Sequence, residues 1–144
     1  YMDFVTNGKM AHFGTFNGNP LAMAGVRAID RICSDEALAT AEDFNLQALI
    51  RIGDIIDEYQ LPAHTVGFGV KGCVTWSTKP VRNYRDYKAT DFGVAEAHWL
   101  FAINRGIITP PGLDEQWLIS LAHGQTEIDI LVEDFRDFAQ VIRS

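Results

Sequence analysis

The pattern that most constrains the fold of this chain is a helical stripe near its C-terminal end. From Thr126 onward, apolar side chains recur every three or four residues: Ile128, Leu131, Val132, Phe135, Phe138 and Ile142. That spacing places all of them on one face of an α-helix and leaves the other face polar. A helix with one apolar face needs a partner layer, so the pattern predicts a helix packed on other structure.

Three further segments predict helices, at residues 20–33, 34–61 and 91–105. Asn19 and Pro20 are the residue types preferred at the N-cap and the first helical position. The second segment carries apolar residues in steps of three and four: Ala41, Phe44, Ala48, Ile52, Ile55 and Tyr59. Together with the helix from Thr126, these segments account for about half of the chain and predict a largely helical outer layer.

Short β-forming runs lie between the helical segments. Residues 73–76 are the best strand candidate, and residues 107–109 and 118–122 are two more. Residues 77–90 are polar and aromatic, which indicates a structured loop. Helices and strands therefore mix without regular βαβ alternation, and the sequence predicts an α+β fold with a small mixed or antiparallel sheet covered by helices.

Charge and composition exclude several functions. Twelve Lys and Arg against nineteen Asp and Glu give a net charge of −7, which argues against a nucleic-acid partner even though Tyr84, Arg85 and Tyr87 could form a stacking patch. No apolar run approaches the roughly 20 residues that span a bilayer, so we expect no membrane span. Cys33 and Cys73 have no metal-ligand spacing, and no two histidines do. We therefore expect no metal site and a cytoplasmic location.

Several polar side chains have plain structural explanations. The acidic residues of the second and last helices are expected on solvated faces: Asp54, Asp57, Glu58, Glu133, Asp134 and Asp137. His98 is expected at the edge of the buried stripe, beside a core-facing Trp99. Cys33 and Cys73 are expected to be small buried apolar groups.

The glycine-rich loop before the first long helix is the most informative stretch. Gly14, Thr15 and Gly18 lead into the helix that starts at Asn19-Pro20. Such a loop offers backbone N–H groups, the positive end of a helix dipole and here a hydroxyl, which are the parts of a phosphate-binding site. An ordinary capped turn is the alternative, and short glycine patterns alone favour it.

The residues around this loop resemble a known family. HFGTFNGNPLAMA at residues 12–24 is similar to a segment of class III pyridoxal-phosphate-dependent aminotransferases, and most of all to glutamate-1-semialdehyde 2,1-aminomutases. Three more segments resemble the family in the same order: VRNYRD at 81–86, NRGI at 104–107 followed by PP, and ISLAH at 119–123 followed by EID. Together the four segments cover nearly the whole chain.

The resemblance implies the C-terminal part of a fold-type I aminotransferase. Residues 1–34 would be the end of the large cofactor domain, and residues 35–144 the C-terminal small α/β domain. Gly14 and Thr15 would bind the phosphate of the pyridoxal 5'-phosphate held by the neighbouring subunit, which implies a homodimer. Glu115 aligns with a glutamate near the substrate, which would be an amino acid or an amine.

The chain also departs from the family pattern. None of Lys9, Lys71, Lys79 and Lys88 lies in the context of the family's cofactor-binding lysine. No catalytic residue is therefore expected in this chain, and the isolated 144 residues should be inactive. Gly112 and Gly124 replace the family's usual residues, which leaves aminomutase and transaminase activity both open. A stand-alone α+β module for binding or dimerisation, without catalysis, is the alternative.

Overall fold

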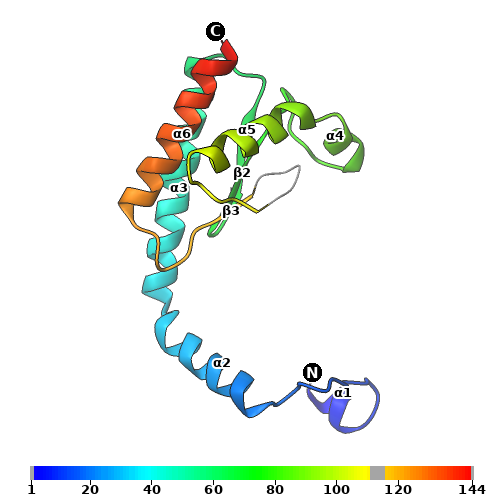
Figure 1. Cartoon of the computed structure of the whole chain (residues 1–144). Helices are drawn as coiled ribbons and strands as arrows, with labels where there is room; N and C mark the ends of the chain where they lie inside the picture. The colour runs from blue at the N-terminus through cyan, green and yellow to red at the C-terminus, as the bar shows by residue number, and fades with distance from the viewer. Residues whose placement is uncertain (1, 111–115, 144) are drawn as a thin grey trace. The chain divides into compact units, whose positions relative to one another are not determined.

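The computed structural model describes residues 2–110 and 116–143. Its contacts divide the chain into two compact units, Tyr1–Ser34 and Asp35–Ser144. They are called the N-terminal unit and the C-terminal unit below, and each is described by itself. Figure 1 labels the helices and strands of both units.

The N-terminal unit contains two helices, α1 (Met2–Thr6) and α2 (Pro20–Ile32). The predicted start of α2 is confirmed, because the Asn19 side chain accepts hydrogen bonds from the N–H groups of Leu21 and Ala22. None of the described residues of this unit is buried. Its large apolar side chains are exposed, and several lie on α2: Leu21, Met23, Val26, Ile29 and Ile32.

The C-terminal unit is α+β, as the sequence predicts. Among its described residues, three strands form an antiparallel sheet in the order β1-β2-β3. The elements are α3 (Asp35–Glu58), β1 (His64–Phe68), β2 (Lys71–Thr75), α4 (Tyr84–Lys88), α5 (Phe92–Asn104), β3 (Trp117–Leu118) and α6 (Gln125–Arg143). The long helices α3 and α6 lie side by side (Figure 1) and pack together directly.

The two predicted stripes of α3 and α6 form the core. Ile52 and Ile55 from α3 and Ile128 and Phe135 from α6 are essentially fully buried. Trp76 completes the core with ring-centroid distances of 6.1 Å to Phe135 and 5.8 Å to Phe138. Ile142, at the end of the predicted stripe, is exposed.

Glycine decides how β3 joins the sheet. Gly72 on β2 pairs with Trp117 on β3, and a Cβ at position 72 would lie 2.4 Å from the Trp117 indole. Any side chain there would displace the ring. Gly72 is therefore required by close packing, whereas Gly69 serves the hairpin turn between β1 and β2, where its φ is +57°.

The structure corrects four local predictions. Residues 77–90 contain the short helix α4, and residues 107–109 form no strand. Of residues 118–122, only Leu118 lies in a strand, and a turn follows. Cys33 and Cys73 are half-buried rather than buried. Isolated β-branched residues near Pro110 predict a strand only if a partner strand is present, and the three-stranded sheet provides none for them.

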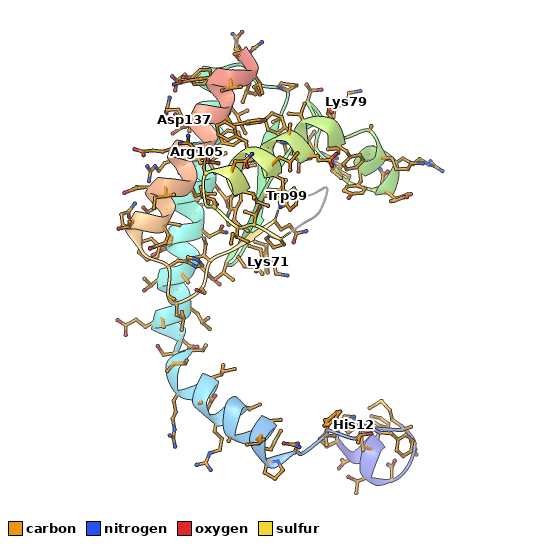
Figure 2. All side chains as sticks on the ribbon, in the orientation of Figure 1. His12, Lys71, Lys79, Trp99, Arg105 and Asp137 are labelled. Carbon is orange, nitrogen blue, oxygen red and sulfur yellow. The ribbon has the colours of Figure 1, made fainter. Side chains whose placement is uncertain are left out.

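His98 and Trp99 have the reverse of their expected positions. His98 is buried, and its ring stacks on Phe138 at a centroid distance of 4.8 Å. Trp99 is half-buried, because its indole N–H donates to the Thr109 carbonyl oxygen at 3.3 Å. Figure 2 labels Trp99 on α5. The hydrogen bond of the indole N–H thus orients the Trp99 ring toward the loop, and the His98 ring is buried in the core instead.

Candidate functional site

The loop formed by residues 12–19 is a tight turn directly before α2. The Asn17 N–H donates to the Gly14 carbonyl at 3.1 Å, and the Asn19 N–H donates to the Phe16 carbonyl at 3.1 Å. Gly18 has φ +72°, a conformation that favours glycine. Gly14 and Thr15, the two predicted cofactor-binding residues, therefore lie together in one turn.

The hydrogen-bond donors of this loop divide into used and free groups. The Asn19 cap takes the N–H groups of Leu21 and Ala22, at 2.9 and 3.4 Å, and Pro20 has none to offer. Among the described residues, the N–H groups of Thr15 and Phe16 and the Thr15 hydroxyl have no partner. The free donors thus lie around Thr15 rather than at the start of the helix.

The chemistry of these donors fits a phosphate group. The loop is exposed, and residues 10–20 contain no carboxylate that would repel an anion. Backbone N–H groups and a hydroxyl beside the positive end of a 13-residue helix are favourable partners for phosphate oxygens.

Glu115, the predicted substrate-pocket residue, lies outside the described residues, as do Pro111 and Gly112. The described chain on either side of this segment lines a cavity of about 380 Å³ between the 106–110 loop, β3 and α6. Its walls are mainly apolar, with Ile107, Trp117 and Ile119 among them, and His123 and Glu127 are the ionisable groups in its lining.

His123 and Glu127 build the start of α6. The His123 Nδ1 accepts from the Ser120 N–H at 2.9 Å, and the Glu127 carboxylate accepts from the Gly124 N–H at 2.8 Å. The second contact is the acidic half of a capping box. It lowers the pKa of the Glu127 carboxyl, helped by the backbone N–H of Glu127 itself and by His123.

Two buried polar groups were not expected from the sequence. Asn45 is buried in α3, where its amide donates to the carbonyls of Gly69 and Lys71, at 2.7 and 2.9 Å, and accepts from the Trp117 indole at 2.7 Å. Its position between Ala41 and Ala48 in the apolar stripe is the signal that could have placed it inside.

Asp134 is the second unexpected group, and its predicted solvated position is wrong. Its side chain is 2% exposed and lies 2.7 Å from the Arg105 guanidinium, which also pairs with Asp137. Figure 2 labels Arg105 and Asp137. Burial raises the pKa of Asp134, against the lowering influence of His98 and Arg105. A helix face that looks acidic in the sequence thus carries one buried carboxylate, paired with an arginine whose side chain is 45% exposed.

Two other findings bear on the kind of site. No helix among the described residues is long and apolar enough to cross a membrane. Across residues 2–110 and 116–143, no group of three or more His, Cys, Asp or Glu side chains is arranged to hold a metal ion.

Comparison with known proteins finds relatives whose sequence similarity extends over almost the whole chain. A glutamate-1-semialdehyde 2,1-aminomutase of Thermomicrobium roseum is 30% identical over 139 residues, which are 95% of this chain and 32% of the relative. One of Syntrophobacter fumaroxidans is 25% identical over 133 residues, 92% of this chain and 31% of the relative. The homologues found along almost the whole chain are thus glutamate-1-semialdehyde 2,1-aminomutases. The chain spans about 30% of the length of these relatives, and no family model matches it.

Solved structures of aminotransferases share the fold. A β-phenylalanine aminotransferase from Variovorax paradoxus matches with a TM-score of 0.80 and 23% identity, over 92% of this chain and 30% of that one. A glutamate-1-semialdehyde aminomutase from Pseudomonas aeruginosa matches with a TM-score of 0.77 and 20% identity, over 89% and 30%. The α+β architecture is thus that of the C-terminal region of these aminotransferases.

Two of the four aminotransferase-like segments have clear structural roles in this chain. The segment at residues 81–86 forms the cap of α4, where Asn83 accepts from the N–H groups of Arg85 and Asp86. The segment after residue 119 forms the turn and cap of α6 described above. Both segments thus cap helices of the C-terminal unit, whereas in the 12–24 segment the N–H groups of Thr15 and Phe16 have no partner among the described residues.

Proposed function

We propose that this chain is the C-terminal part of a pyridoxal-phosphate-dependent class III aminotransferase close to the glutamate-1-semialdehyde aminomutases. The observation that carries the proposal is the combination of homology along nearly the whole chain with a donor-rich loop at Thr15. The complete protein would transfer or relocate an amino group on an amino acid or amine substrate. Bound pyridoxal phosphate would supply the electron sink for that chemistry.

The role proposed for the 12–19 loop is to hold the cofactor phosphate of the neighbouring subunit. The Thr15 hydroxyl and the N–H groups of Thr15 and Phe16 would donate to phosphate oxygens. Gly14 keeps the loop compact, because a Cβ there would lie 2.6 Å from the Asn17 side chain. A loop that completes a site across an interface requires a homodimer.

The exposed apolar surface of the N-terminal unit supports assembly. Phe13 is 92% exposed, Phe16 79% and Leu21 84%. Apolar side chains at this density mark surfaces that other protein covers. We infer that the rest of the complete protein and its dimer partner cover them.

The proposed division of labour places the cofactor-binding lysine outside these 144 residues. Lys9, Lys71, Lys79 and Lys88 are all exposed, and none lines the cavity between the 106–110 loop, β3 and α6. A lysine that holds the cofactor needs a site from which water can be excluded. On this proposal residues 1–34 are the end of the large cofactor domain, and residues 35–144 form the small domain with Glu115 at the substrate pocket. The complete enzyme would be cytoplasmic, and the isolated chain would be inactive.

The experiment is cofactor binding by the complete protein that contains this chain. Thr15→Ala removes one donor to a charged group, so we expect the dissociation constant for pyridoxal phosphate to rise by roughly tenfold to a hundredfold. Thr15→Ser keeps the hydroxyl and should bind nearly as tightly as the wild type. Thr40→Ala is the matched control, since the Thr40 hydroxyl donates to the Glu36 carbonyl at an exposed position of α3. Equal affinity of Thr15→Ala and wild type would contradict the proposal.

One observation favours a second candidate, a binding or dimerisation module without catalysis. The C-terminal unit has its own core and its own sheet, so it can keep its shape without an active site. The intact mass of the natural protein separates the two candidates. A mass near 16.1 kDa supports the module, and a mass about three times larger supports the aminotransferase.

A further inference from the structure

We propose that His12 is a positioning residue for the Thr15 loop and that it acts through Asn17. The inference rests on the proposed function, because it concerns the same phosphate-binding loop. It adds a residue that holds the loop in its binding conformation without touching the phosphate.

The first observation is a side-chain contact that closes the loop. The Asn17 Nδ2 lies 3.3 Å from the His12 Nε2, and Figure 2 labels His12 in this unit. An amide nitrogen only donates, so this bond requires the imidazole Nε2 to accept, which is the role of Nε2 in the tautomer with its proton on Nδ1. The bond joins positions 12 and 17 and therefore brackets Thr15.

The second observation is that the Asn17 side chain also packs against Gly14. The Asn17 amide packs over Gly14, so closely that a Cβ at position 14 would lie 2.6 Å from Oδ1 and 2.7 Å from Nδ2. The Asn17 N–H also donates to the Gly14 carbonyl. The amide is thus held between the histidine ring and the backbone on which Thr15 is carried.

The consequence concerns the cost of ordering the loop. The loop is exposed, and no buried contact holds it in place. A flexible loop must lose conformational entropy when it binds a ligand, and this loss weakens affinity. The His12–Asn17 bond orders the loop before the ligand arrives and leaves the free donors at Thr15 and Phe16 available.

A double-mutant cycle in the complete protein tests the inference, with pyridoxal phosphate as the probe and inorganic phosphate as a competitor. His12→Leu and Asn17→Ala should each raise the dissociation constant roughly three- to tenfold, the effect of one hydrogen bond. The double variant should be no weaker than either single variant, because both remove the same contact. His12→Gln, whose side-chain oxygen can accept from Asn17, should recover most of the affinity.

Three results separate the possible failures. If the effects of His12→Leu and Asn17→Ala multiply, His12 acts independently of Asn17 and the inference is wrong. If Thr15→Ala weakens binding and His12→Leu does not, the proposed function stands and the positioning role fails. If neither Thr15→Ala nor His12→Leu changes the affinity, the proposed phosphate site itself fails. Nitrogen NMR of the His12 ring gives a readout independent of activity: the Nδ1–H form expected in wild type should become less populated in Asn17→Ala.

Discussion

Within each of the two units of the chain, different interactions define the structure. In the C-terminal unit, α3, α6 and the sheet bury a shared apolar core, and even polar Asn45 is sealed within it. In the N-terminal unit no described residue is buried, and α2 is defined by its Asn19 cap and its own backbone hydrogen bonds. The comparison shows that local signals are enough to define a helix, while stability comes from what the helix packs against. A unit with free donors and uncovered apolar side chains fits a role completed by other protein.

The largest expected difference in the free energy of unfolding is between the alanine variants of two phenylalanines. Phe135 is 1% exposed in the C-terminal unit and Phe16 is 79% exposed in the N-terminal unit. Phe135→Ala should lower the free energy of unfolding of the chain by about 3–5 kcal/mol, because it leaves a cavity in the core. Phe16→Ala should change it by less than about 0.5 kcal/mol. Urea unfolding followed by tryptophan fluorescence measures both, and similar losses would erase the distinction between the units.

Alanine variants of two asparagines, one in each unit, should show a smaller difference in stability. Asn45→Ala leaves the Trp117 indole and two carbonyls without their partner, so we expect a loss of about 3 kcal/mol in the free energy of unfolding. Asn19→Ala removes a helix cap worth about 1 kcal/mol, but it should reduce only the helicity of α2. Circular dichroism together with the fluorescence transition distinguishes a local effect from a global one. A lower unfolding midpoint in Asn19→Ala would show that the N-terminal unit contributes to the global stability.

The smallest effect concerns the buried carboxylate of the C-terminal unit. The pKa of Asp134 is raised in the folded state, so the folded state binds this proton more tightly than the unfolded state does. As pH rises from about 4 through the raised pKa, the wild type should lose stability relative to Asp134→Asn.

Asp129 lies on the same helix, and its pKa is shifted in the opposite direction. Arg51 lies 2.5 Å from its carboxylate, and this hydrogen bond lowers the pKa of Asp129. The stability that Asp129 contributes should be present above about pH 4 and be lost as the pH falls through its lowered pKa. Urea midpoints of the wild type, Asp134→Asn and Asp129→Asn between pH 3 and 7 test both signs, and a flat difference for Asp134→Asn would refute its burial.

The fold could be predicted where one pattern dominates the segment. The stripes of α3 and α6 and the Asn19-Pro20 start of α2 are confirmed, because periodicity and capping are local properties. The short strands were harder, since Trp117 pairs only because Gly72 leaves room for its ring across the sheet. The burial of Asp134 depends on Arg105, which is distant in sequence, and no local pattern reports that pairing.

The candidate site was found by resemblance and refined by geometry. The glycine pattern alone predicted a generic helix N-terminus, whereas the structure shows that the Asn19 cap uses the first helical donors and that Thr15 keeps the free ones. The contact between His12 and Asn17 could not be predicted, because His12 alone has no distinctive pattern and its role depends on how the loop folds back. The placement of the phosphate on this loop stays a prediction.

The most direct test of the account is to find the lysine that holds pyridoxal phosphate in the complete protein. Borohydride reduction followed by peptide mapping fixes the cofactor to that lysine and identifies it. We predict one modified lysine per subunit, located outside these 144 residues. Modification of Lys9, Lys71, Lys79 or Lys88, or no modification of any lysine, would contradict this prediction.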